Sequence, residues 1–270
     1  MMIDFKTAVL GQTGLTIHRL GLSGTYRPGK KAIYEAIDNG VNFFFCFGID
    51  TQLIRVLKDV MKTNREKFVV ATGSYNYIWG RQNTIKALEK RLRQLGTDYI
   101  DIFLFLGVMK EKEFSNHIKA ELCQIRDQGK ARAIGISTHD RKFAGRLMDE
   151  GILNAIMMRY NAAHRGAETE IFPYLAKHNP AVISYTATRW SYLTRRPKEW
   201  PKDKLIPDAG MCYRFVLSNN NIDVCLNAPR NIRQLRENLK AVELGPLSDE
   251  EMRFMREFGD VVHNQKKYFM

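Results

Sequence analysis

Short apolar runs alternate with amphipathic stretches along almost the whole chain, and the alternation repeats. One run and the stretch that follows it take mostly about 20 to 30 residues, the length of a strand, a helix and two loops. We expect strands at Leu20–Gly24, Val41–Phe45, Phe68–Thr72, Tyr99–Leu106, Ala131–Ser137, Ala155–Met158, Ala181–Tyr185 and Ile222–Leu226. The run Tyr99–Leu106 is apolar at almost every position, which is typical of a parallel strand buried on both faces. The pattern therefore predicts an α/β fold built on parallel strands.

The stretches between these runs have the periodicity of helices. One buried stripe with three- and four-residue spacing is formed by Ile85, Leu88, Leu92 and Leu95. Near the end of the chain, Ser248 and Glu251 have the spacing of a capping box. This last helix follows the eighth strand and its helix, so we expect an extra C-terminal helix added to the main fold.

Eight strands separated by helices can close into a barrel or form an open, doubly wound sheet. An open sheet that binds a dinucleotide needs a GxGxxG loop after its first strand, and the segment from Leu20 to Tyr26 (LGLSGTY) lacks it. The sequence therefore predicts a TIM (β/α)8 barrel. No linker or low-complexity stretch divides the chain, so we expect a single domain over residues 1–270.

The chain carries 42 Lys and Arg against 29 Asp and Glu, a net charge of +13. The basic residues are spread along the chain, which argues against nucleic acid as the partner and favours a solvated basic surface with small anionic ligands. No apolar run approaches the roughly 20 residues that span a bilayer. The four cysteines lack metal-binding spacing. We therefore expect a cytoplasmic protein with reduced thiols, no metal and no membrane partner; the sequence predicts no oligomeric state.

Several segments, in a fixed order, have the form of known family motifs. They are Leu10–Ile17 (LGQTGLTI), Gly40–Phe44 (GVNFF), Leu95–Asp101 (LGTDYID), Gly129–Ser137 (GKARAIGIS), Tyr160–Asn161, and Arg236–Asn238 followed by Leu244–Ser248. Together they cover nearly the whole chain, which resembles the aldo-keto reductases. The resemblance implies a barrel with a short N-terminal hairpin and hydride transfer between NADP(H) and a carbonyl. In that family a tyrosine protonates the carbonyl oxygen, helped by a lysine, an aspartate and a histidine.

The four positions that correspond to these catalytic residues hold other residue types. Phe45 stands where the aspartate is expected, and Asp50 stands at or near the position of the tyrosine. Gly73 replaces the lysine, and Leu106 replaces the histidine. Phenylalanine and leucine cannot donate a proton, and glycine has no side chain to carry a charge. This sequence therefore lacks the family's proton-transfer group.

The part of the sequence that corresponds to the cofactor site is better retained. By resemblance, Tyr185 is expected to stack on the nicotinamide and Ser137 to bind its carboxamide. Arg230 can clamp the 2′-phosphate, because a guanidinium binds phosphate oxygens in pairs. Gln234 and Asn238 lie four residues apart on one helix and are expected to face the adenine. The resemblance therefore predicts NADP(H) as the cofactor.

Other polar residues follow the strands and are candidates for replacing the lost chemistry, since barrel active sites lie at the carboxyl ends of the strands. Tyr75 follows the lost lysine position and His139 follows the fifth strand, so either can serve as the proton donor. The alternative is that Tyr75 is a loop aromatic and His139 a residue at the start of a helix. The residues expected to line a substrate pocket are Tyr26, Arg159, Asn161 and Arg189.

Two further features of this end of the barrel leave alternatives open. Asn161 can instead satisfy backbone groups of its own loop, which would be a structural role. The long connection over residues 186–207 is rich in Arg and Lys and contains Trp190 and Trp200, so we expect it to cover the site as a basic lid.

The sequence leaves two main functions open. The first is an NADP(H)-binding oxidoreductase that acts on a small, anionic carbonyl compound through a non-standard proton donor. The second is a catalytically inactive protein of the same fold with a sensing, scaffolding or regulatory role. A polyanion binder that uses the net charge of +13 is a third, weaker reading.

Overall fold

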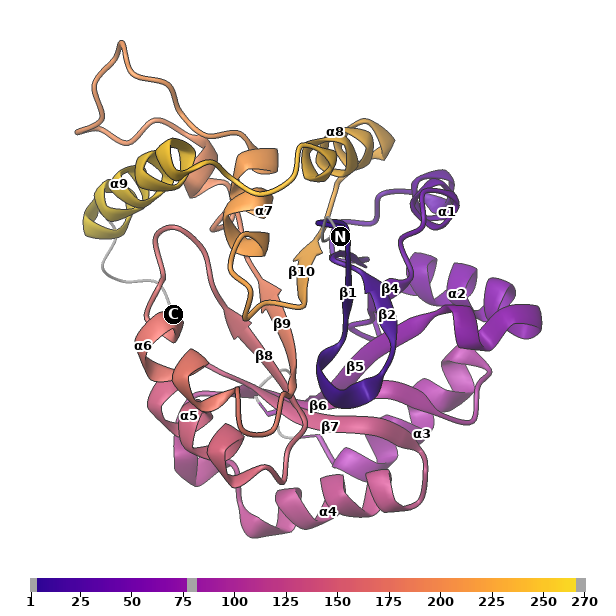
Figure 1. Cartoon of the computed structure of the whole chain (residues 1–270). Helices are drawn as coiled ribbons and strands as arrows, with labels where there is room; N and C mark the ends of the chain where they lie inside the picture. Colours follow the sequence, from indigo (N-terminus) through magenta and orange to yellow (C-terminus); the bar gives the residue numbers. More distant parts are fainter. Residues whose placement is uncertain (1–3, 77–81, 266–270) are drawn as a thin grey trace.

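The strands of the computed structural model, which describes residues 4–76 and 82–265, form a closed parallel barrel (Figure 1). Around the barrel the strands follow the order β10, β3, β4, β5, β6, β7, β8 and β9. Their bounds are β3 Leu20–Ser23, β4 Phe43–Phe45, β5 Val69–Tyr75, β6 Ile100–Val108, β7 Ala131–Thr138, β8 Ala155–Arg159, β9 Ala181–Tyr185 and β10 Val224–Asn227. Each of the eight expected strands is present, so the predicted TIM (β/α)8 barrel is confirmed.

Helices follow the strands and surround the barrel (Figure 1). Their bounds are α1 Lys30–Asp38, α2 Thr51–Asn64, α3 Thr84–Leu95, α4 Asn116–Asp127, α5 Arg141–Glu150, α6 Ala167–Glu170, α7 Ala209–Leu217, α8 Ile232–Glu243 and α9 Asp249–Gln265. Short 3-10 turns are η1 Gly11–Thr13, η2 Arg65–Lys67, η3 Glu111–Glu113, η4 Phe172–Tyr174 and η5 Tyr192–Thr194. Within the described part of the chain, no helix combines the length and the apolar composition needed to cross a bilayer.

A short antiparallel hairpin closes one end of the barrel, as the family resemblance predicts. It pairs β1 (Thr7–Val9) with β2 (Thr16–His18) and lies across the barrel in indigo in Figure 1. Leu10 and Ile17 of this hairpin are buried in the hydrophobic cluster inside the barrel. The Gly11 amide donates to Asp223 Oδ2 at 3.1 Å, which ties the hairpin to the start of β10. The other end of the barrel, where the strands have their carboxyl termini, is left open for a site.

The apolar residues of the strands pack on two sides of the sheet. In β4, Phe43 and Phe45 belong to the cluster inside the barrel, whereas Phe44 belongs to the layer between the sheet and the helices. This follows from the strand geometry, since successive side chains point to opposite faces. The run over residues 99–106 is therefore apolar at nearly every position because both faces of β6 are buried.

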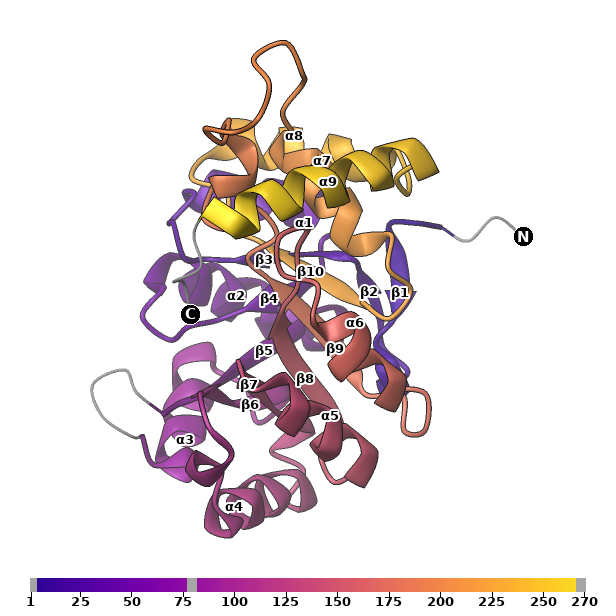
Figure 2. The same cartoon turned by 90° about the vertical axis from the view of Figure 1, so that its left-hand side faces the viewer.

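The predicted extra C-terminal helix, α9, is confirmed and begins at the predicted capping box. Ser248 N donates to Glu251 Oε2 at 2.8 Å, and Glu251 N donates to Ser248 Oγ at 3.2 Å. Trp200 packs against Phe258 of α9, with ring centroids 4.9 Å apart. The part of the long connection after Arg195 projects from the barrel beside α9 (Figures 1 and 2). Arg196 bonds to carbonyl oxygens of the connection itself and Lys204 pairs with Glu257 of α9, and neither lines the cavity at the carboxyl ends of the strands, whereas uncharged residues at the start of the connection do; this corrects the expected basic lid.

Candidate functional site

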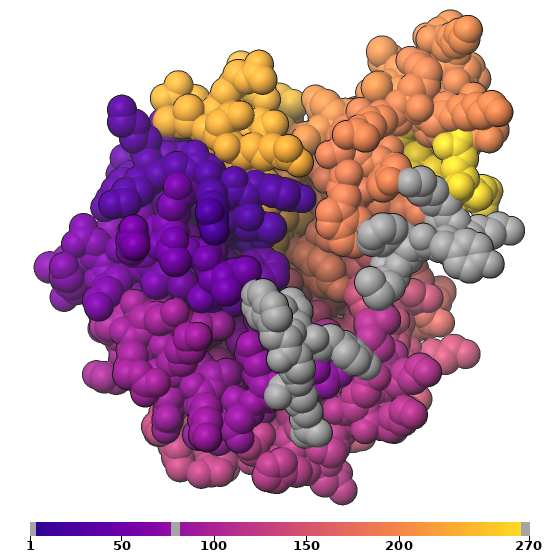
Figure 3. Space-filling model, turned by 180° about the vertical axis from the view of Figure 1, so that it is seen from behind, coloured from indigo at the N-terminus to yellow at the C-terminus, as the bar shows by residue number. Residues whose placement is uncertain are grey.

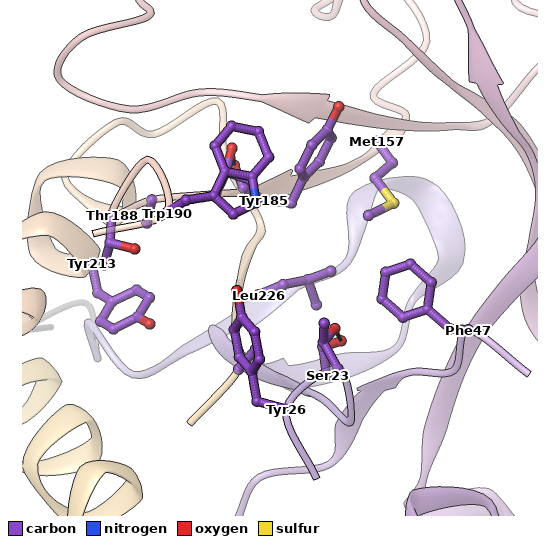
Figure 4. Close-up of a pocket in the computed structure, with 13 residues that line it drawn as sticks. Ser23, Tyr26, Phe47, Met157, Tyr185, Thr188, Trp190, Tyr213 and Leu226 are labelled. Atoms are coloured by element: carbon purple, nitrogen blue, oxygen red, sulfur yellow. Dashed lines mark hydrogen bonds between the residues drawn. The ribbon is translucent and has the colours of Figure 1, made fainter. Parts of the chain in front are cut away.

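A cavity of about 270 Å³ opens at the carboxyl ends of the strands (Figure 4). It is lined by Ser23, Thr25, Tyr26, Phe47, Met157, Tyr185, Thr186, Ala187, Thr188, Trp190, Tyr213, Leu226 and Ala228. In the space-filling view from the side opposite the hairpin, the surface is hollowed where the indigo N-terminal segment meets the orange and yellow C-terminal segments (Figure 3). The described residues of the lining have aromatic, aliphatic and hydroxyl side chains, and none of them is Asp, Glu, Lys, Arg or His. We call this the main cavity.

Tyr185 ends β9 and forms one wall of the main cavity (Figure 4). Its phenol is hydrogen-bonded to the Ser137 side chain, so two of the predicted cofactor residues lie together. Burial raises the pKa of Tyr185, and the Ser137 hydrogen bond and the Arg159 charge oppose that rise. Arg159 is the register partner of Tyr185 on β8, and the His139 ring lies edge-on to Tyr185 at 6.4 Å. These four side chains form a polar group behind the cavity wall.

The loop after β9 forms the next part of the wall and has an unusual backbone. Thr186, Arg189, Trp190 and Ser191 all have φ between 48° and 71°, the left-handed region that non-glycine residues rarely occupy. Such residues cost about 1–3 kcal/mol each and persist only where surrounding contacts hold them.

Asn161 and Arg189 supply two of these contacts and do not line the main cavity. Asn161 is fully buried; its Nδ2 donates to the Thr186 carbonyl oxygen at 2.9 Å, and its Oδ1 accepts from Ala163 N at 3.1 Å. The Arg189 guanidinium is 1% exposed and donates to the Val262 carbonyl oxygen of α9 at 2.5 Å. For Asn161 the structural alternative therefore fits its contacts, and Arg189 anchors the loop to α9.

At the opposite rim, Tyr26 and Arg230 meet. The Arg230 guanidinium lies over the Tyr26 ring, 4.8 Å from its centroid, and Arg230 itself is exposed. Gln234 Oε1 accepts a hydrogen bond from Arg230 N at 2.9 Å. Asn238 is buried, and its Nδ2 lies 3.5 Å from Asn227 Oδ1 at the end of β10. Arg230 is thus available to a ligand, whereas Gln234 and Asn238 bond to the protein's own loop and strand.

The four positions that the family resemblance assigns to the catalytic residues are all buried. Phe45 and Leu106 lie in the hydrophobic cluster inside the barrel. Gly73 faces Leu104 of β6, and a Cβ at Gly73 would overlap with the Leu104 carbonyl oxygen. Asp50 is buried and accepts hydrogen bonds from Phe47 N at 3.2 Å and Gly48 N at 2.8 Å, at the start of α2. Burial raises the pKa of Asp50, and its carboxylate holds the turn before α2.

The two predicted proton donors, Tyr75 and His139, lie outside the lining of the main cavity. Tyr75 stacks against Phe47, with ring centroids 6.2 Å apart and an interplanar angle of 11°, so Phe47 stands between Tyr75 and the cavity. Burial raises the pKa of Tyr75 well above its ordinary range. Burial, reinforced by the charges of Arg159 and Arg141, lowers the pKa of His139. His139 is therefore neutral at pH 7. It contacts Tyr185 of the cavity wall but does not line the cavity itself.

The residues that sequence reasoning missed are mainly aromatic. Trp190 and Tyr213 both line the main cavity, and Phe47 forms the wall on the side of Tyr75 (Figure 4). Trp190 was part of the long connection singled out in the sequence, but its inward direction depends on the left-handed backbone of the loop. Tyr213 belongs to the apolar helix α7, and in such a helix the sequence predicts that an aromatic residue is part of the hydrophobic core.

Comparison with known proteins identifies the family. The model of the aldo/keto reductase family matches residues 29–260. The uncharacterized oxidoreductase YqkF of Bacillus subtilis is 23% identical, over 92% of this chain and 94% of that protein. The NADH-specific methylglyoxal reductase of Escherichia coli is 24% identical, over 95% of this chain and 99% of that protein.

Solved structures show the same fold. The holo form of aldo-keto reductase AKR11C1 from Bacillus halodurans superposes with a TM-score of 0.77 at 19% identity, covering 94% of this chain and 96% of that one. An aldo/keto reductase from Klebsiella pneumoniae, in complex with NADP and acetate, superposes with a TM-score of 0.71 at 19% identity, covering 94% of this chain and 95% of that one. On the match of the family model to most of its length, this chain belongs to the aldo-keto reductase family.

Proposed function

We propose that this protein binds NADP(H) in the main cavity and has lost the carbonyl reduction of its family, so that it acts as a cofactor-binding protein with a sensing or scaffolding role. The observation that carries the proposal is the composition of the cavity wall: over residues 4–76 and 82–265, the side chains that line it are aromatic, aliphatic or hydroxyl-bearing, and none has a carboxyl, imidazole or ammonium group. The proposal draws further support from the relatives, because two Klebsiella pneumoniae structures of this fold are complexes with NADP and with NADPH.

The residues of the main cavity suit the cofactor at two points. Tyr185 offers an aromatic ring backed by the Ser137 hydroxyl, which suits the flat nicotinamide and its carboxamide. Arg230 offers an exposed guanidinium at the opposite rim, which suits a phosphate. Gln234 and Asn238 contribute less than the family resemblance implies, because both side chains are engaged by the protein.

The loss of turnover follows from the missing proton donor. Bound NADPH supplies a hydride, but reduction of a carbonyl also needs a proton at the oxygen, and a positioned acid contributes about 10²–10⁴-fold to the rate. Tyr185 and Tyr213, two of the tyrosines in the cavity wall, both have pKa values raised by burial. For Tyr185 the charge of Arg159 opposes this rise without cancelling it, and for Tyr213 every cause of the shift raises the pKa.

A second candidate function is a reductase whose proton donor is Tyr185. One observation favours it: Arg159 lies beside Tyr185 in register, and its charge lowers the pKa of the phenol against the effect of burial. A lysine has the same effect on the tyrosine in the family's usual site. In this case Arg159 would also favour a small carbonyl substrate with a negative charge.

Titration with NADPH, followed by tryptophan fluorescence, tests the cofactor proposal. Trp190 lines the cavity and Trp200 packs on α9, so we expect saturable quenching that is strongly reduced in Trp190→Phe and retained in Trp200→Phe. Absence of saturable NADPH binding would contradict the proposal.

NADPH oxidation in the presence of methylglyoxal and other small carbonyls separates the two functions. The main proposal expects no oxidation above the rate without protein. Oxidation that requires a carbonyl and disappears in Tyr185→Phe, while NADPH binding is retained, would establish the second candidate instead. The variant removes only the hydroxyl, so the ring that faces the cavity is kept.

A further inference from the structure

A second, smaller cavity of about 120 Å³ lies behind Phe47, away from the main cavity. Its wall consists of Phe47, Gly48, Ile49, Tyr75, Gln82, Lys90 and Arg91. These residues come from the turn before α2, the end of β5 and the helix α3. None of them carries a carboxyl group, whereas two are cationic.

Arg91 is the most unusual of these residues because it is buried and no carboxylate among the described residues lies within ion-pair distance of its guanidinium; the charge of the buried Asp50 acts on it from farther away. The side chain is 4% exposed. Its Nη1 donates to Gln94 Oε1 at 2.7 Å and its Nη2 donates to the Phe47 carbonyl oxygen at 3.2 Å, while Nε has no hydrogen-bond partner. Among the residues that the structure describes, none of the ion pairs includes Arg91. A buried cation of this kind is costly unless an anion accompanies it.

The turn before α2 is shaped to accept this guanidinium. Gly48 has a φ of 90°, and a Cβ at this position would overlap with the Arg91 guanidinium carbon. The guanidinium therefore lies directly on the backbone of Gly48, and a side chain there would displace it. Asp50 holds the same turn through the amides of Phe47 and Gly48. The position of Arg91 is thus fixed by two elements distant in sequence.

Tyr75 adds a second buried donor without a partner. It is 8% exposed, and no described residue forms a hydrogen bond with its Oη. Burial raises the pKa of Tyr75, so the phenol stays protonated and can donate. Gln82 Oε1 accepts from Tyr75 N at 3.2 Å, which leaves the Gln82 amide nitrogen as a further donor toward the cavity. A neighbouring cavity of about 250 Å³ along α3 shares Gln82, Lys90 and Arg91 with it, so a bound group has room for a substituent.

From this arrangement we infer that the cavity behind Phe47 is a second ligand site, which binds a phosphate group through Arg91, Tyr75, Gln82 and Lys90. Two unpartnered donors and two cations converge on a space that suits one tetrahedral oxyanion with several acceptor oxygens. The phosphate is either inorganic phosphate or the terminal group of a small phosphorylated molecule. The inference is separate from NADP(H) binding, because the main cavity and this one have only Phe47 in common.

The first measurement is binding of inorganic phosphate to the full chain, by calorimetry and by thermal unfolding, at constant ionic strength set with sodium chloride. We expect saturable binding and a rise in the midpoint of unfolding with phosphate that chloride does not reproduce. Competition between inorganic phosphate and a phosphorylated small molecule, such as glycerol phosphate, then distinguishes the two possible ligands. If the site also binds the substituent, the phosphorylated molecule binds more tightly than inorganic phosphate. Absence of any phosphate-specific binding or stabilisation would overturn the inference.

Variants locate the site. Tyr75→Phe and Lys90→Gln are each expected to weaken phosphate binding by about tenfold or more, as loss of a donor to a charged group predicts. Arg93→Gln is the matched control, because Arg93 is an exposed cation of the same helix outside both cavities. Equal phosphate affinity in wild type, Tyr75→Phe and Lys90→Gln would overturn the assignment.

Stability without phosphate gives an independent readout. Tyr75→Phe removes only a buried hydroxyl that lacks a partner, so in phosphate-free buffer this variant is expected to be at least as stable as the wild type. A variant that loses stability equally with and without phosphate would instead show a structural role for the hydroxyl. Retained NADPH binding in Tyr75→Phe, and retained phosphate binding in Arg230→Ala, keep this test separate from that of the main cavity.

Discussion

Gly73 of β5 faces Leu104 of β6 so closely that a Cβ on residue 73 would overlap with the Leu104 carbonyl oxygen. Residue 73, which the family resemblance places at the position of the lysine, therefore has no room for any side chain with the present backbone. Leu106 lies next to the same position inside the barrel. A lysine at residue 73 would require the backbone of β5 or β6 to shift.

Substitution at this position tests the packing directly. Gly73→Ala is expected to lower the free energy of unfolding by about 1–3 kcal/mol, the usual cost of forcing an extra methyl group into a packed interior. Chemical denaturation measures the change. Ser74→Ala is the control, because it adds no atoms to the same strand and removes a buried hydroxyl that has no partner. A Gly73→Ala protein as stable as the wild type would show that the strands separate easily.

Arg230→Ala is expected to distinguish the two nicotinamide cofactors. The guanidinium is free to bind the 2′-phosphate, which NADPH has and NADH lacks. A hydrogen bond to a charged group contributes about 1.5–3 kcal/mol, so its loss is expected to weaken NADPH binding by at least about tenfold. The affinity for NADH should change little. Calorimetry with both cofactors measures the difference. Arg233→Ala removes an equally charged, exposed residue from the first turn of α8, directly after the segment that carries Arg230, and should leave both affinities unchanged.

Asn161→Ala is expected to loosen the wall of the main cavity. Its side chain bonds to the Ala163 amide and the Thr186 carbonyl, and both bonds are lost inside the protein. We expect a loss of about 2–3 kcal/mol in the free energy of unfolding, together with weaker NADPH binding, because Thr186 begins the left-handed loop. Denaturation and fluorescence titration give the two values. Asn221→Ala, at an exposed position, should change stability by no more than about 0.5 kcal/mol.

The stability of the hairpin contact is expected to depend on pH through Asp223. Burial raises the pKa of this carboxyl to about 6, against the opposing effect of the amides of Val182 and Gly11. The folded protein therefore binds this proton more tightly than the unfolded chain does. The contribution of Asp223 to stability is fully present below about pH 4 and is lost as the pH rises through 6.

Asp223→Asn removes this dependence. Both amides bond to Oδ2 in the wild type, and the amide oxygen of asparagine can accept both. The variant is expected to match the wild type near pH 4 and to be more stable at pH 8, by on the order of 3 kcal/mol from the size of the shift. Urea unfolding from pH 4 to pH 8 tests this. A difference between the two proteins that stays constant over the range would rule out Asp223 as the source.

The sequence predicts those helices and strands whose burial follows from the spacing of apolar residues or from a capping motif within the element itself. The strand β6 follows from its continuous apolar run, and α9 follows from the capping pair Ser248 and Glu251. The replacement of the proton-transfer group stays a prediction from the sequence, made from the family motifs around Phe45 of β4, Gly73 of β5 and Leu106 of β6. The position of Tyr185 beside Ser137 likewise follows from the ends of two strands.

The rest depends on contacts between distant segments, which no local pattern records. Arg189 looks like one more basic residue of a polar loop, yet it is buried because Val262 of α9 accepts its hydrogen bond. Arg91 occupies a helix position at which an arginine normally reaches solvent, and its burial depends on the glycine at position 48. Trp190 lines the main cavity from a loop whose backbone is left-handed, a conformation that no local sequence pattern predicts.

The ring of Phe47 is a wall common to the main cavity and the cavity behind it. If NADPH and phosphate bind as proposed, movement of this ring on binding of one ligand would couple the two sites. Thermodynamic linkage then requires that the factor by which phosphate changes the affinity for NADPH equals the factor by which NADPH changes the affinity for phosphate. Binding of one ligand would in this way report the concentration of the other.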